Sequence, residues 1–320
     1  MKYTYAVARI RAKELSLFSD AVIDQLMACR DEKACLAFLA EKGWGNGNRD
    51  ETADGILATE REKTWETLRE LVSDQSVYDV LALPNEFHNV KAAIKLVYTG
   101  SGHASIFYKG TSLDPEEVRK IIEQREFSRL PASMAEAARE ATEVLLQTGD
   151  GQLCDIIMDR ACLEAVKEAG KNTDSSLIRD YAESTVAIAD IKIAVRCCKT
   201  HKPIDFMRRA LASCDSLDAE RLAQSAQMGM SSLCDYLASA GYGEGADALM
   251  KSASAFECWC DNRMIKTIQP QKYNSFSSGP IVAYVLAREN EIKTVRIILS
   301  GKRNGLSDDY IRERVREMYV

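Results

Sequence analysis

The chain has 320 residues, of which 46% are hydrophobic, 28% charged and 7% aromatic, and its formal net charge is −6. This composition can form a buried core and excludes a disordered chain, whereas the scattered Lys and Arg argue against a nucleic-acid-binding surface, which needs a basic patch. The longest apolar run, at residues 281–287, is far shorter than the ~20 residues of a membrane-spanning helix, so no direct membrane span is expected.

Helices are expected along most of the chain, because apolar residues recur at helical spacing and Ala, Leu, Glu, Arg and Lys are plentiful. Pro84 is expected to interrupt the pattern, because proline removes a helical hydrogen bond. Glycines mark loops at 43–47 and 100–110. The first helices are predicted, in chain order, over residues 12–29, 54–72 and 89–98.

The clearest helix start lies at residue 114. Asp114 can cap the helix, Pro115 suits the first helical position, and Glu117 completes a capping box. Because no pair of strands is indicated, the predicted fold class is all-α. The remaining helices are predicted over residues 132–147, 153–168, 174–199, 216–239, 245–268, 281–299 and 307–319.

A short pattern occurs three times at equal spacing. Each copy holds a polar residue, a β-branched apolar residue and a lysine, and a second basic residue follows three or four places later. The lysines are Lys91, Lys192 and Lys293, so both intervals are 101 residues. This period exceeds the roughly 34 to 47 residues of common helical repeats. Three helical lobes with approximate threefold symmetry are therefore predicted, over about 1–113, 114–215 and 216–320.

No motif for a metal, a nucleotide or another cofactor is present. The ten cysteines form no C-x-x-C pair and the three histidines stand apart from them, so buried, reduced thiols are the expected state. The glycine-rich segments lack the G-x-x-x-x-G-K-[ST] pattern of a phosphate-binding loop. No catalytic residue, cofactor or metal ligand is predicted. Each histidine, His88, His103 and His201, is interpreted as structural.

Three stretches resemble the C-subunit family of V-type and A-type ATPases, which is related to the d subunit of the eukaryotic V-ATPase. Residues 5–12 are similar to the opening of that family. Residues 88–91 resemble its first-lobe signature, although Glu86 stands where an aspartate is expected. The strongest similarity is at the end of the chain, over 287–293, 296–299, 301–302 and 311–320.

The resemblance implies three helical lobes arranged as a funnel. The wide mouth would receive the foot of the rotor shaft, made of D-type and F-type subunits, and the narrow end would rest on the membrane proteolipid ring. The chain would then be a non-catalytic central-stalk subunit, peripheral on the cytoplasmic face of the membrane, and it would couple the rotor during ATP-driven ion transport or ATP synthesis. A generic helical scaffold is the alternative.

Two sets of repeat residues have competing interpretations. Lys91, Lys192 and Lys293 are candidates for partner contact, lining the funnel or its rim and touching the shaft. Alternatively, each lysine pairs with a carboxylate on its own helix, which stabilises the helix only slightly. The residues two places before them, Asn89, Asp190 and Glu291, are expected to hold the turn or neighbouring backbone of each lobe, and partner contact is the alternative.

Overall fold

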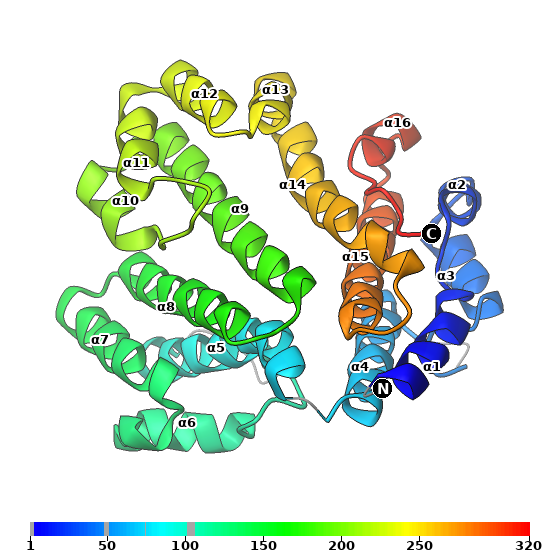
Figure 1. Ribbon diagram of the computed structural model, residues 1–320, viewed down its shortest axis with the longest axis horizontal. Helices are drawn as coiled ribbons and strands as arrows, with labels where there is room; N and C mark the ends of the chain where they lie inside the picture. The colour runs from blue at the N-terminus through cyan, green and yellow to red at the C-terminus, as the bar shows by residue number, and fades with distance from the viewer. Residues whose placement is uncertain (1–2, 48–50, 74, 101–105) are drawn as a thin grey trace. The chain divides into compact units, whose positions relative to one another are not determined.

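The computed structural model describes residues 3–47, 51–73, 75–100 and 106–320. Helices make up 77% of the chain, and no strand occurs in these ranges, which confirms the all-α prediction (Figure 1). The chain forms two compact units. The first combines both ends of the chain, Met1–Asp74 and Tyr242–Val320, and the second is Gln75–Gly241. The lobes at 1–113, 114–215 and 216–320 stay a prediction.

The helices of the first unit come from the two ends of the chain and surround α15, which is buried on nearly every side. Seventeen of its 25 residues are buried, including the polar Arg288, Asn290 and Glu291, so this helix forms the centre of the unit. The helices are α1 (Thr4–Glu14), α2 (Asp20–Met27), α3 (Glu32–Glu41), α4 (Ala53–Leu71), α13 (Gly243–Lys251), α14 (Ala253–Ile268), the 3-10 turn η3 (Gln269–Tyr273), α15 (Gly279–Arg303) and α16 (Asp308–Arg312).

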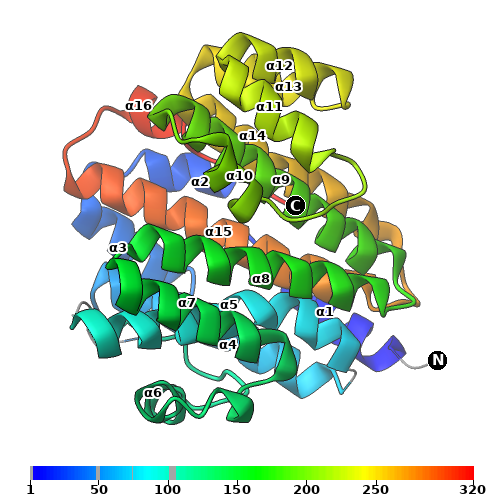
Figure 2. The same cartoon turned by 90° about the vertical axis from the view of Figure 1, so that its left-hand side faces the viewer.

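The second unit is organised around α8, which contacts the long helices on both of its sides. Figure 2 shows α7, α8 and α9 running side by side. The helices are α5 (Gln75–Thr99), α6 (Pro115–Gln124), the 3-10 turn η2 (Phe127–Arg129), α7 (Ala132–Thr148), α8 (Gly151–Lys171), α9 (Ser176–Thr200), α10 (Ile204–Ala210), α11 (Ala219–Met228) and α12 (Met230–Ser239). Apolar side chains of α5, α6, α7 and α8 share one core.

Several helix predictions are confirmed, because the local signals are strong. The Asp114 side chain caps α6 by accepting a hydrogen bond from the Glu116 amide at 2.9 Å, and Pro115 begins the helix. The helices predicted over 54–72, 132–147, 153–168, 174–199 and 281–299 correspond to α4, α7, α8, α9 and α15.

The single helix predicted over 12–29 is wrong, because the chain breaks between α1 and α2. Ser19 is extended there, and the Phe18 amide donates to the Glu291 carboxylate at 2.6 Å. The interruption predicted at Pro84 is also wrong, because α5 continues through it. Buried Val80 and Phe87 lie on either side of the proline, so tertiary packing outweighs the ~3 kcal/mol cost of proline in a helix.

Three later predictions joined separate helices or ran too far. The predicted helix over 216–239 is divided at Gly229, whose φ is 124°, into α11 and α12. The one over 245–268 is divided at Ser252, which is extended and caps α14. The one over 307–319 ends at Arg312, and the Glu317 amide donates to the Asn262 side chain instead of continuing the helix.

Gly170 provides a test of the packing of α8 on α9. A Cβ atom at Gly170 would lie 2.4 Å from the Cβ of Ala182, whereas one at Gly151 in the same helix would meet nothing closer than 4.0 Å. Because overpacking of a core typically costs 1–3 kcal/mol, Gly170→Ala is expected to lower the free energy of unfolding by about 1–2 kcal/mol. Gly151→Ala is the matched control and should cause no loss. Urea denaturation measures both, and equal stabilities would contradict this account.

Candidate functional site

The three copies of the repeat lie on the three longest helices of the described structure. These helices, α5, α9 and α15, have 25 residues each. Lys91 and Lys192 lie on α5 and α9 in the second unit, and Lys293 lies on α15 in the first. The equal spacing in the sequence therefore corresponds to equal elements in the structure.

In the second unit, the polar residue that precedes each lysine by two places is buried and holds a distant stretch of backbone. The Asn89 side-chain oxygen accepts a hydrogen bond from the Tyr108 amide at 2.8 Å. The Asp190 carboxylate accepts one from the Ala212 amide at 3.0 Å. In each case a long helix holds the chain that follows it.

Glu291 does the same in the first unit, but with the opposite end of the chain. It is 2% exposed and accepts the hydrogen bond from Phe18, the residue that ends the α1–α2 connection. The prediction that Asn89, Asp190 and Glu291 hold neighbouring backbone is therefore confirmed.

Two of the repeat lysines make ion pairs with neighbouring helices. The Lys91 ammonium lies 2.5 Å from the Asp159 carboxylate on α8, and the Lys293 ammonium lies 2.6 Å from Asp261 on α14. In these two cases the lysine pairs with a carboxylate on a neighbouring helix and not, as the alternative interpretation expected, with one on its own helix. Lys192 is half-buried on α9. Partner contact by the three lysines stays a prediction.

The histidines have structural surroundings where they are described. The His88 ring nitrogen lies 2.9 Å from the Ile106 carbonyl oxygen, and the ring meets Tyr108 edge-on at 4.9 Å between centroids. His201 ends α9 in the left-handed backbone conformation. The structural interpretation is confirmed for His88, whereas His103 lies outside the described residues.

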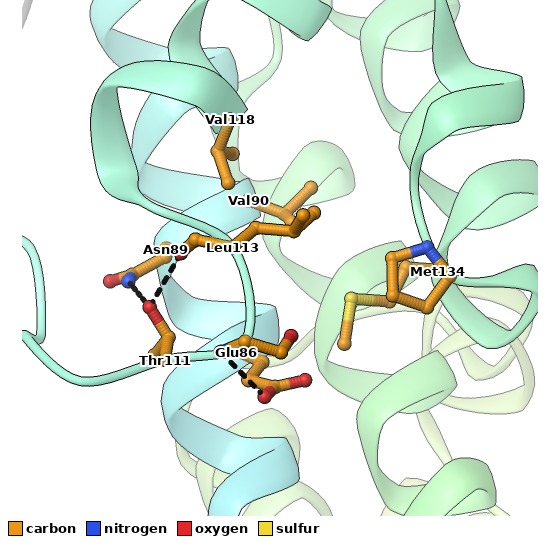
Figure 3. A pocket seen from close by; sticks show the side chains of 9 residues that line it. Glu86, Asn89, Val90, Thr111, Leu113, Val118 and Met134 are labelled. Atoms are coloured by element: carbon orange, nitrogen blue, oxygen red, sulfur yellow. Dashed lines mark hydrogen bonds between the residues drawn. The ribbon is translucent and has the colours of Figure 1, made fainter.

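A small pocket beside Asn89 shows how the segment after α5 is held (Figure 3). The Asn89 amide group donates to Thr111, and the Glu86 carboxylate accepts from the Ser112 amide at 3.1 Å. The space available to the centre of a water molecule is only ≈ 10 Å³, which accommodates about one water. The polar side chains of this pocket therefore hold the segment that follows α5, and the pocket is too small for a ligand larger than water.

The first unit contains a buried ionic cluster that the sequence patterns do not predict. The Arg288 guanidinium, on α15, lies 2.5 Å from Glu60 of α4 and also pairs with Glu291. All three residues are at most 6% exposed. The Glu60 carboxylate also accepts hydrogen bonds from the Gly45 amide and the Lys63 ammonium. The signal in the sequence is a pair of opposite charges, Arg288 and Glu291, three residues apart and next to the apolar run at 281–287.

Burial dominates the electrostatics of two of the anchors. It raises the pKa of Glu291 to about 7, although the charge of Arg288 and the Phe18 amide act in the opposite direction. It likewise raises the pKa of Asp190 to about 7, opposed mainly by the Ala212 amide. Burial also raises the pKa of Asp261, but Lys293 and Arg316 together lower it below its ordinary value.

Nearly the whole chain matches one known family. A family model described as ATP synthase (C/AC39) subunit matches residues 6–314. The chain belongs to the ATP synthase (C/AC39) subunit family. This match confirms the resemblance seen in residues 5–12, 88–91 and 287–299, and it identifies the chain as a subunit of a V-type or A-type ATPase.

Three relatives named as C subunits align with this chain over 85–99% of their own length. The C subunit of the V-type sodium ATPase of Enterococcus hirae is 22% identical over 326 residues, covering 100% of this chain and 99% of the relative. The C subunit of the A-type ATP synthase of Halorubrum lacusprofundi is 23% identical, with 97% and 96% covered. That of Methanocaldococcus jannaschii is 22% identical, with 97% and 85% covered.

Two general features of this family member bear on its chemistry. Among the described residues, no helix has the length and apolar character needed to cross a membrane. Within the same part of the chain, no group of three or more His, Cys, Asp or Glu side chains is arranged to hold a metal ion. None of the ten cysteines, all of which lie in the described ranges, forms a disulfide.

The buried cluster provides a second test. Arg288→Leu would leave Glu60 and Glu291 buried without their shared cation, and removing one partner of a buried ion pair typically costs about 3–5 kcal/mol. The loss should be smaller at pH 5 than at pH 8, because the raised pKa of Glu291 means that the folded protein takes up a proton there as the pH falls.

Arg303→Leu, on the same helix, is the control for Arg288→Leu. Arg303 is 51% exposed and pairs with Glu32, so its removal should have little effect at either pH. Urea denaturation of both variants measures the difference, and similar losses for the two would show that the buried cluster has no special importance.

Proposed function

We propose that this chain is the non-catalytic central-stalk subunit that couples the rotor shaft of a V-type or A-type ATPase to the membrane proteolipid ring. The observation that carries the proposal is the family match over residues 6–314, together with relatives named as C subunits that align from end to end. The relatives include a sodium ATPase and ATP synthases, so the role extends to ATP-driven ion transport or ATP synthesis.

The proposed architecture is a funnel of three lobes, over about 1–113, 114–215 and 216–320. Three features support it: the 101-residue spacing of the repeat, the equal lengths of α5, α9 and α15, and the backbone anchor that each of these helices carries. Each lobe would contribute one long helix to the wall of the funnel. The shaft subunits, of the D and F types, would enter the wide mouth, and the narrow end would face the ring.

The proposed task is mechanical, and the packing of the helices suits it. A part that transmits torque must resist deformation, which dense helix packing provides. The buried anchors at Asn89, Asp190 and Glu291 add to this by tying irregular segments to long helices. Each of the two interfaces would bury on the order of 1,000 Å² or more to be specific. The chain would act as a peripheral subunit on the cytoplasmic face of the membrane.

Affinity purification tests this proposal directly. The tagged chain is isolated from detergent-solubilised membranes of its own host, and retained proteins are identified by mass spectrometry. We expect shaft subunits and the proteolipid to be recovered together. If the chain is recovered alone, or if the ATPase assembles normally without it, the coupling role is wrong and a generic helical scaffold becomes the better explanation.

The role of the repeat lysines in shaft binding can be tested in the same assay. If they line the funnel, replacing all three with glutamine should lower the retention of shaft subunits by about tenfold, which corresponds to ~1.4 kcal/mol. A control variant carries the same change at three exposed lysines. Circular dichroism verifies that both variants fold, and equal retention would exclude shaft contact by the repeat lysines. The test variant changes Lys91, Lys192 and Lys293, and the control changes Lys120, Lys199 and Lys251.

A further inference from the structure

Asn89 and Asp190 occupy the same position of the repeat, 101 residues apart, but their chemistry differs. Asn89 has a neutral amide group, which forms hydrogen bonds with Tyr108 and Thr111 in the segment that follows α5. Its oxygen accepts from the Tyr108 amide, and its nitrogen donates to the Tyr108 carbonyl at 2.8 Å and to the Thr111 hydroxyl at 3.1 Å. The site therefore needs one acceptor and at least one donor.

Asp190 meets the same need with a carboxyl group. One oxygen accepts from the Ala212 amide at 3.0 Å, but the other is buried and has no hydrogen-bond partner among the described residues. The residue is 0% exposed, and no lysine or arginine in the described part of the chain lies within ion-pair distance. An ionised carboxylate is strongly disfavoured in such a place, whereas a protonated carboxyl group is neutral, like the amide of Asn89.

The charged groups around Asp190 do not supply a counter-ion, because they are committed elsewhere. On α8, Lys167 pairs with Asp215 at 2.8 Å and lies 3.9 Å from Glu183, while Arg160 pairs with Glu164. Burial raises the pKa of Asp190 and outweighs the charges around it. Those of Arg160 and Lys167 lower this pKa, and the negative charge of Glu183, on α9, raises it. Most of the other charged groups on the packed elements have ion-pair partners of their own: Asp205, Arg208 and Arg209 of α10, Glu220 of α11, and Lys91 and Lys95 of α5. The remaining titratable groups are Arg221, which lies over the ring of Tyr236, Asp235 of α12, and Cys214, whose pKa is raised mainly by burial and in part by the charge of Asp190.

We propose that Asp190 carries a proton in the folded protein, and that loss of this proton weakens the attachment of segment 211–218 to α9. The attachment of this segment to α9 would therefore depend on pH. The segment also borders a polar pocket whose other walls include Arg221, Tyr236 and Ser239, so its loosening would change the shape of that surface. The proton on Asp190 does not depend on the proposed coupling role, and either can hold without the other.

The direction of the pH effect follows from proton linkage. Burial raises the pKa of Asp190 to about 7 when the segment is closed, whereas an exposed aspartate has a pKa near 4. Between these values the closed form binds a proton that the open form does not, so opening becomes easier as the pH rises. Above about pH 7 both forms are ionised, and the dependence should level off.

Hydrogen exchange of the Ala212 amide measures this opening. The protection of a peptide covering 211–218 is followed by mass spectrometry from about pH 5 to pH 8 and corrected for the intrinsic pH dependence of exchange. For the unmodified chain we expect protection to fall up to tenfold per pH unit until about pH 7 and then level off. Asp190→Asn should abolish the slope. Equal slopes in the two proteins would overturn the proposal.

A mirror variant and a direct titration strengthen the test. Asn89→Asp places the carboxyl group in the equivalent position of α5, so the peptide covering 106–113 should gain the pH dependence that Asp190→Asn loses. If Asp190→Asn does not fold, the carboxyl-carbon NMR shift of Asp190 in the unmodified chain still decides the matter. A titration midpoint near neutral pH supports the proposal, and one below about pH 5 overturns it.

Discussion

The guanidinium of Arg288 connects two helices whose charged residues are 228 positions apart in the chain. This guanidinium is the only cation that the structure pairs with the Glu291 carboxylate among the described residues, whereas Glu60 also pairs with Lys63. Glu291 in turn fixes the Phe18 amide and so sets where α1 ends and α2 begins. Arg288 and Glu291 thus link α15 to α4 and to the α1–α2 connection within the first unit.

In three long helices, a polar side chain holds a backbone amide from a distant part of the chain. The chemistry of that side chain differs among the three. Asn89 is a neutral amide, Glu291 is a carboxylate beside an arginine, and Asp190 is a carboxylate without a cation. All three satisfy a buried amide, which would otherwise cost the energy of a lost hydrogen bond. The place of the anchoring side chain on its helix is therefore the same in all three copies, whereas the charge of that side chain differs.

Sequence patterns predicted the features that depend on local chemistry. The fold class, most long helices and the cap at Asp114 follow from apolar spacing and residue preference. The breaks near Phe18, the continuation through Pro84 and the short α16 could not be predicted, because distant contacts decide them. For the candidate site, the anchors were found from the repeat alone. The cluster around Arg288 was missed, because its partner Glu60 is far away in the sequence.

The first unit is assembled from two segments that are far apart in the sequence, and this affects how it folds during synthesis on the ribosome. Met1–Asp74 emerges first, yet the helix at the centre of its unit is α15, near the other end of the chain. Domains generally fold as units and in the order in which they are made. The apolar side chains of α2, α3 and α4 therefore lack their partner until α15 has been translated. The second unit, continuous in sequence, has no such delay, so the nascent N-terminal segment is where chaperone binding and aggregation would concentrate.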